Sequence, residues 1–119
     1  MEQTQAIDAL AALAQPTRLA AFRRLVAAYP DAVPAGDIAN ACTVPHNTMS
    51  THLAILTRAG LLSVTRESRS MLYRANLEGF RALVAFLTQD CCTGRPEICA
   101  PLLVPLEAAC NCQPEPVDA

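Results

Sequence analysis

The sequence predicts a mainly α-helical fold with one small β-hairpin, in a single domain followed by a short C-terminal segment. Apolar residues recur at helical spacing in several stretches, and two short β-like runs flank a polar tip in the second half of the chain. Apolar residues make up 52% of the 119 residues, which suffices for one packed core and excludes a disordered chain.

The first two helices are predicted from the spacing of their apolar residues. Residues 5 to about 14 place Ile7, Leu10 and Leu13 on one face. Pro16 suits the first turn of a second helix, because its missing N–H would have no helical partner there. The buried face expected for this second helix consists of Leu19, Phe22, Leu25 and Val26.

Two further helices form a predicted helix-turn-helix. A short helix from Ala35 to Ala41 and a longer one from about Pro45 to Arg58 are joined by a tight turn, as that motif requires. Gly60 stands where a glycine ends a helix. The longer helix is expected to bury Met49, Leu53 and Leu56. Its expected outward face consists of His46, Asn47, Thr48, Thr51 and His52.

A hairpin and a last helix complete the predicted order. Residues 61–66 and 71–75 are two β-like runs around the polar tip 67–70. The last helix is expected from about Leu77 to Asp90. Its apolar face consists of Phe80, Leu83, Val84 and Leu87. Helix, helix, helix-turn-helix, hairpin and helix is the order of a winged helix-turn-helix.

The chain is expected to divide at its cysteines. Residues 1–90 form the predicted winged-helix domain, and residues 91–119 form a Cys-rich segment and tail. The six cysteines are Cys42, Cys91, Cys92, Cys99, Cys110 and Cys112. Because neither a signal peptide nor an apolar run of about 18 residues is evident, we expect a cytoplasmic protein without a membrane partner. Thiols stay reduced in the cytosol, which favours metal or redox chemistry over a disulfide scaffold.

The charge distribution indicates a nucleic-acid partner despite a formal net charge of −2. All nine basic residues are arginine, whose guanidinium binds phosphate and guanine edges bidentately. Residues 45–75 carry Arg58, Arg66, Arg69 and Arg74 against the single acidic Glu67. A local basic patch is a better guide to DNA binding than the total charge, so double-stranded DNA is the predicted partner. An arginine-rich solvated surface is the alternative.

Several stretches of the sequence resemble one family. They are Pro16-Thr17-Arg18-Leu19, the run from Pro45 to Leu56, Ala59-Gly60-Leu61-Leu62 and Tyr73-Arg74. Over about residues 5–90, they resemble the ArsR/SmtB family of metalloregulatory repressors. The most specific part is Ser50, His52, Leu53, Leu56, Ala59, Gly60 and Leu61. The resemblance implies a dimer that represses its operator when ligand-free and releases it when an ion binds.

One family feature is missing from this sequence. Many arsenic- and cadmium-responsive members carry a Cys-Val-Cys pair in the helix before the recognition helix. Residues 36–42 here contain only Cys42, at a shifted position. That ion site is not carried over, so the ligands of any ion are expected elsewhere in the chain.

The start of the longer helix is expected to read the operator, because a recognition helix presents its N-terminal residues to base edges in the major groove. Hydroxyl and amide groups suit that contact. The residues are His46, Asn47, Thr48, Thr51 and His52. Ser50 is expected to bind a phosphate. Helix capping is the alternative for Asn47 and Thr48, and packing is the alternative for His52.

Arg66 and Arg69 flank the tip of the predicted hairpin. A guanidinium there is expected to enter the minor groove or lie along phosphates, where negative potential concentrates. A solubilising turn is the alternative reading of these two residues.

The first and last helices are the predicted homodimer surface. Each is more apolar than a solvated helix in a small monomer needs to be. The two-fold symmetry of such a dimer predicts a near-palindromic operator, with half-sites about one helical turn apart.

Cys91, Cys92 and Cys99 form the predicted metal site. A glycine and a proline between them allow the chain to bend so that Cys99 returns to the adjacent pair. Three thiolates without a fourth ligand suit a soft, three-coordinate ion, so arsenite is the expected inducer and antimonite the next. Zinc or cadmium, with Cys110 or Cys112 as a fourth ligand, is an alternative. Thiol redox sensing and unligated tail thiols are the others.

A thiol enzyme such as an arsenate reductase is the remaining and most distant alternative. Such enzymes activate a thiolate at a helix N-terminus, in a phosphate-binding loop or beside a base. Cys91 and Cys92 instead follow the predicted end of a helix, where the helix dipole disfavours a thiolate. The sequence has neither a C-x5-R loop nor a C-x-x-C pair, so we expect no enzymatic activity.

Overall fold

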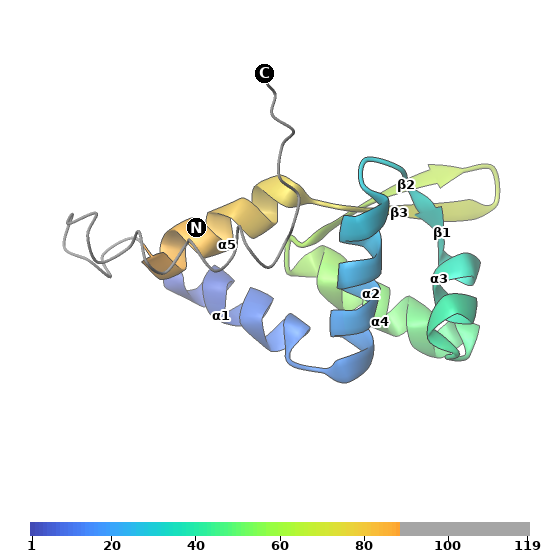
Figure 1. Ribbon diagram of the computed structural model, residues 1–119, viewed down its shortest axis with the longest axis horizontal. Coiled ribbons are helices and arrows are strands. Elements are labelled where there is room, and N and C mark those ends of the chain that lie inside the picture. The colour runs from blue at the N-terminus through green and yellow to red at the C-terminus, as the bar shows by residue number, and fades with distance from the viewer. Residues whose placement is uncertain (89–119) are drawn as a thin grey trace, which may run out of the picture. The chain divides into compact units, whose positions relative to one another are not determined.

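The computed structural model describes residues 1–88, and it confirms the predicted winged helix-turn-helix (Figure 1). The elements in chain order are α1 (Gln3–Leu13), α2 (Pro16–Ala28), β1 (Val33–Pro34), α3 (Ala35–Cys42), α4 (His46–Arg58), β2 (Leu62–Glu67), β3 (Ser70–Ala75) and α5 (Leu77–Thr88). The predicted end of the last helix at Asp90 and the predicted segment 91–119 lie outside the described residues.

Helix α1 turns its smallest side chains toward the core. Its buried residues are Ala6, Ala9 and Ala12. Ile7 and Leu10 are 54% and 42% exposed, while Leu13 packs against the core. Most of the apolar stripe predicted from the sequence therefore faces solvent in the single chain.

Helix α2 begins at Pro16, as predicted. Phe22 and Leu25 are buried, but Leu19 and Val26 are 43% and 39% exposed, so half of the predicted buried face was wrong. A helix rotates by about 100° per residue, which places Leu19 and Val26 together on one side of Phe22 and Leu25 on the other. The core of this small domain therefore covers the side of the stripe that carries Phe22 and Leu25 and leaves the other side exposed.

Helices α3 and α4 form the predicted helix-turn-helix. The predicted inner face of α4 is fully buried and consists of Met49, Leu53 and Leu56. Gly60 ends the helix with a φ of 86°, a left-handed conformation that glycine adopts without steric cost. The backbone N–H of Leu61 then donates to the carbonyl of Leu56 at 3.0 Å. This bond satisfies one of the carbonyls that a helix end leaves without a helical partner.

The sheet has the strand order β1-β3-β2, with both outer strands antiparallel to β3. The predicted hairpin is confirmed, and Leu62 pairs with Ala75 at its base. Strand β1 was not predicted, because two residues are too few to show an alternating pattern. Its Val33 pairs with Tyr73 and so fixes the segment between α2 and α3 to the central strand.

The core lies between the helices and the base of the hairpin. Its largest fully buried side chains are Leu25, Ile38, Met49, Leu53, Leu56, Leu61 and Leu83. Farther along the hairpin Val64 and Met71 are 38% and 39% exposed, and the hairpin projects from the helical body (Figure 1). No helix within residues 1–88 is long and apolar enough to span a bilayer.

Candidate nucleic-acid interface

The turn between α3 and α4 sets the direction of α4, the predicted recognition helix. Thr43 has a φ of 56°, a conformation that β-branched residues rarely adopt. Its N–H donates to the carbonyl of Asn40 at 3.2 Å, and the N–H of Val44 donates to that of Ala39 at 3.0 Å. These bonds and the buried faces of both helices hold the turn.

The first turns of α4 present a polar face to solvent. The exposed residues are His46, Asn47, Thr48, Ser50 and Thr51. Oδ1 of Asn47 accepts the backbone N–H of Thr48 at 2.9 Å, but the N-cap of α4 is Pro45, so Asn47 lies inside the helix and does not cap it. The hydroxyl of Thr51 donates to the carbonyl of Asn47 at 3.3 Å. Hydroxyl and amide groups at these positions are the types that contact base edges and phosphates.

His46 is exposed and is also tied to α3. Its Nε2 lies 3.2 Å from Oδ1 of Asn40, and since that oxygen accepts, the ring nitrogen donates. A Cβ built on Gly36 would lie 3.3 Å from Cε1 of His46, so the ring lies close against the start of α3. This contact helps to orient the first turn of α4.

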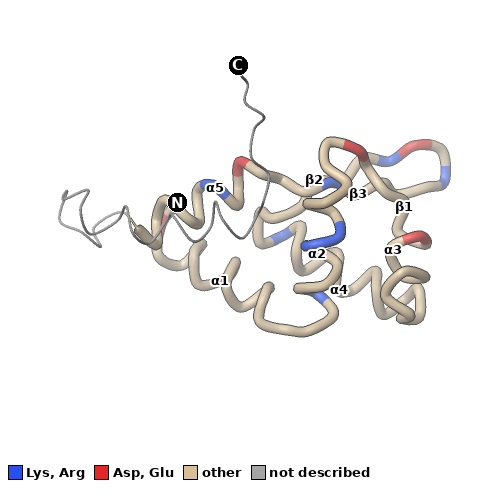
Figure 2. The backbone as a smooth tube through the Cα atoms, in the orientation of Figure 1, with Lys and Arg blue, Asp and Glu red and all other residues tan. Residues whose placement is uncertain are grey.

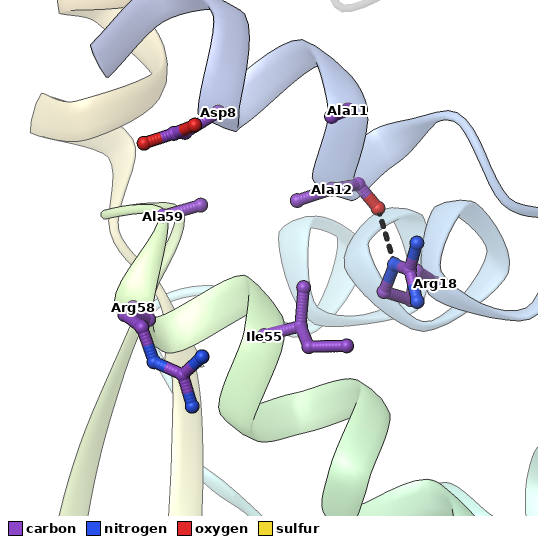
Figure 3. A pocket seen from close by; sticks show the side chains of 7 residues that line it. All are labelled: Asp8, Ala11, Ala12, Arg18, Ile55, Arg58 and Ala59. Atoms are coloured by element: carbon purple, nitrogen blue, oxygen red, sulfur yellow. Dashed lines mark hydrogen bonds between the residues drawn. The ribbon is translucent and has the colours of Figure 1, made fainter. Parts of the chain in front are cut away.

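His52 was predicted on the outward face, but it is half-buried and hydrogen-bonded to α2. Its Nδ1 lies 3.3 Å from Nη1 of Arg18. Because a guanidinium only donates, Nδ1 of His52 is the acceptor and carries no proton in this contact. Nε of Arg18 also donates to the carbonyl of Ala12 at 2.7 Å, at the end of α1 (Figure 3). Arg18 therefore links α1 to the recognition helix, and the packing role considered for His52 is present.

The hairpin carries its arginines at the end far from the helical body. Arg66 pairs with Met71 across the hairpin, and Arg69 lies in the turn after Ser68, whose φ is 57°. Arg66 and Arg69 are exposed. Figure 2 shows basic and acidic positions at the end of the hairpin that projects from the helices, and Glu67 lies between the two arginines in the sequence. The tip therefore presents two guanidinium groups to solvent, and their contact with DNA stays a prediction.

A hollow of about 370 Å³ lies between α1, α2 and α4 (Figure 3). Its lining consists of Asp8, Ala11, Ala12, Arg18, Ile55, Arg58 and Ala59. None of the residues predicted to contact DNA lines it. The candidate interface is therefore the outer surface of α4 and the hairpin rather than a pocket.

The cysteines predicted to bind an ion, Cys91, Cys92 and Cys99, lie outside the described residues. Cys42 is half-buried at the end of α3 and is a free thiol. Within residues 1–88 no group of three or more His, Cys, Asp or Glu side chains is placed to hold a metal ion.

Comparisons with known proteins match this architecture. The family model of a helix-turn-helix domain matches residues 13–65. The solved structure of a possible transcriptional regulator for arsenical resistance is 27% identical, with a TM-score of 0.61, over 69% of this chain and 82% of that chain. These findings support a helix-turn-helix transcriptional regulator and agree with the resemblance of the sequence to the ArsR/SmtB family.

Two structures of lower sequence identity share the fold of this chain. An ArsR-like transcriptional regulator from Rhodococcus sp. RHA1 is 18% identical, with a TM-score of 0.64, over 92% of this chain and 96% of that chain. A homodimeric winged helix-turn-helix domain from Mycobacterium bovis is 24% identical, with a TM-score of 0.60, over 71% of this chain and 77% of that chain. No curated protein sequence matches the chain. The similar structures are those of transcriptional regulators, which are not enzymes, in agreement with that expectation.

Two residues that connect elements of the fold were not predicted. Arg18 belongs to the stretch that resembles the family, but its bonds to Ala12 and His52 depend on how the helices cross. Asn76 precedes α5 and accepts the N–H of Gly79 at 3.2 Å. A polar residue just before an apolar helix is a known start signal, so Asn76 was accessible from the sequence.

Proposed function

We propose that the chain is a homodimeric repressor that binds a near-palindromic double-stranded DNA operator and is released by arsenite or antimonite. The observation that carries the DNA-binding part is the exposed polar start of α4, together with the exposed Arg66 and Arg69 of the hairpin. The helix suits the major groove, and the arginines suit an adjacent minor groove or phosphates. A cytoplasmic location agrees with this role.

Exposed apolar side chains support the homodimer. Ile7 and Leu10 of α1 are 54% and 42% exposed, and Phe80 of α5 is 36% exposed. Apolar surface of this kind on a small domain marks an interaction site. One structural neighbour, from Mycobacterium bovis, is itself a homodimer. A two-fold dimer of this chain would present two copies of α4 to half-sites about one helical turn apart.

The sensing part rests on the sequence and on the chemistry of thiolates. Cys91, Cys92 and Cys99 supply three soft ligands without a convenient fourth, which suits a three-coordinate ion such as arsenite. A structural neighbour is a possible regulator for arsenical resistance. Cys110 or Cys112 as a fourth sulfur would instead favour zinc or cadmium.

Release would follow from a shift in population. Binding of one ion by three thiolates would reorder the chain directly after α5, next to an expected dimer surface. Operator affinity depends on the distance between the two recognition helices, so a small change there would weaken binding. Coupling of about 1–3 kcal/mol is typical of linked sites and corresponds to about 5- to 150-fold in affinity. By reciprocity, operator DNA would weaken ion binding by the same factor.

The test is operator binding followed by fluorescence anisotropy during titration with arsenite, antimonite, zinc or cadmium. Arsenite should weaken operator binding of the wild type by about 5- to 150-fold and leave Cys99→Ser bound. Cys42→Ser, the matched control, should respond like the wild type. Equal release of Cys99→Ser and wild type by arsenite would refute the proposed site. Release by zinc or cadmium alone would favour the alternative ions, and absence of DNA binding would refute the function.

A further inference from the structure

The end of the recognition helix is hydrogen-bonded to the start of α5 through one side chain. Nδ2 of Asn76 donates to the carbonyl of Gly60 at 3.0 Å, and Oδ1 of Asn76 accepts the N–H of Gly79 at 3.2 Å. The backbone N–H of Asn76 donates to the carbonyl of Leu61 at 2.9 Å. Asn76 is therefore bonded both to the residues that end α4 and to the first turn of α5.

The two helix ends also meet backbone to backbone. A Cβ built on Gly79 would overlap the carbonyl oxygen of Gly60 and lie 3.1 Å from Nδ2 of Asn76. Only glycine at position 79 permits this approach. Because no side chain separates the two backbones, a change in the tilt of α5 acts directly on the end of α4.

The two bonds of the Asn76 side chain have different roles. The bond from Gly79 to Oδ1 is an ordinary helix N-cap, which serine or aspartate would also provide. The bond from Nδ2 to Gly60 contributes nothing to the N-cap of α5, because it satisfies a carbonyl at the end of α4. An amide is the side chain that supplies both the acceptor and the donor.

We propose that Asn76 is a positioning residue for operator binding. Its bond to Gly60 fixes the recognition helix against α5, so that the two copies of α4 in a dimer match the spacing of the two half-sites. This inference rests on the homodimeric operator binding proposed above. It assigns spacing specificity to a residue outside the predicted DNA-contacting set.

The experiment compares the wild type with Asn76→Ser, which keeps the cap acceptor and removes the donor. The probe is a duplex selected from random sequences by the wild-type protein, together with versions that have one base pair added or removed between the half-sites. The wild type should prefer the selected spacing. Asn76→Ser should bind that duplex at least about 5-fold more weakly, and its preference among spacings should fall by a similar factor.

The controls separate positioning from folding. Circular dichroism and the melting temperature should stay close to wild type in Asn76→Ser, and Asn76→Asp provides a second variant that keeps the cap and lacks the donor. Glu78→Gln, an exposed change in the same turn, should keep the wild-type spacing preference. Unchanged spacing preference in both Asn76 variants would overturn the positioning role while leaving the proposed function standing. Failure of the wild type to bind any duplex would overturn both.

Discussion

Arg69 is exposed and has no acidic partner among residues 1–88. It lies in the turn of the hairpin, after Ser68. The only ion pair among residues 1–88 joins Arg81 to Glu78, so Glu67 does not neutralise the guanidinium of Arg69. A guanidinium in this position suits bidentate contact with a phosphate of bound DNA.

Substitution Arg69→Ala should weaken binding to every DNA sequence, because a phosphate contact carries no sequence information. The slope of log affinity against log salt concentration should flatten by about one unit per protomer. Anisotropy titrations at several salt concentrations measure this slope. Arg81→Ala is the matched control, since it removes an exposed arginine from α5 instead of from the hairpin, and its slope should equal that of the wild type. An unchanged slope for Arg69→Ala would remove the hairpin from the contact surface.

Individual positions on α4 were predictable, whereas their partners were not. The helical period from a well-marked start separates the buried Met49 and Leu53 from the exposed Asn47. His52 lies at the border between the buried and exposed faces, where the helical period does not decide whether a side chain is buried. Its partner Arg18 lies 34 positions earlier in the chain, and the contact depends on how α2 packs against α4.

Among the elements, the long helices and the hairpin were predicted correctly because each repeats its pattern over several residues. Strand β1 has only two residues, and its existence depends on pairing with β3 rather than on a pattern of its own. The exposure of Leu19 and Val26 on α2 likewise depends on neighbouring elements rather than on the local pattern. Spacing predicts which side chains share a face, while the width of the buried stripe depends on the helices packed against it.

The close contact between the end of α4 and the start of α5 predicts that replacing Gly79 by alanine destabilises the fold more than replacing Gly60. Gly79→Ala should cost about 1–3 kcal/mol of unfolding free energy, because the added methyl overlaps the carbonyl of Gly60. Gly60→Ala meets no atom within 4 Å and should cost about 1 kcal/mol, from the left-handed backbone alone. Urea unfolding of both variants measures the two losses. A smaller loss for Gly79→Ala than for Gly60→Ala would contradict this close packing.

At the scale of the whole molecule, the single chain leaves apolar side chains of α1 and α5 in water. Substitution Ile7→Asp should prevent the proposed dimer, because it places an unpaired carboxylate in an apolar interface. A cost of about 3 kcal/mol would weaken dimerisation by about 100-fold. Sedimentation at micromolar concentration should then give the mass of one protomer.

Val64→Asp is the control for that experiment. Val64 is also exposed but lies on the hairpin, so the variant should keep the mass of the wild type. A dimer in Ile7→Asp would mean that α1 is not part of the interface. Ion sensing by residues 91–119 stays a prediction, since the cysteines of that segment lie outside the described residues.

The exposed apolar residues of α1 and α5 imply that operator occupancy depends on how much of the protein a cell makes. If two protomers must associate before either recognition helix is correctly spaced, dimerisation and operator occupancy are linked by mass action. Below the dissociation constant of the dimer, occupancy then rises with the square of the number of copies in the cell. A modest fall in synthesis would therefore derepress the regulated genes steeply, with no inducer present.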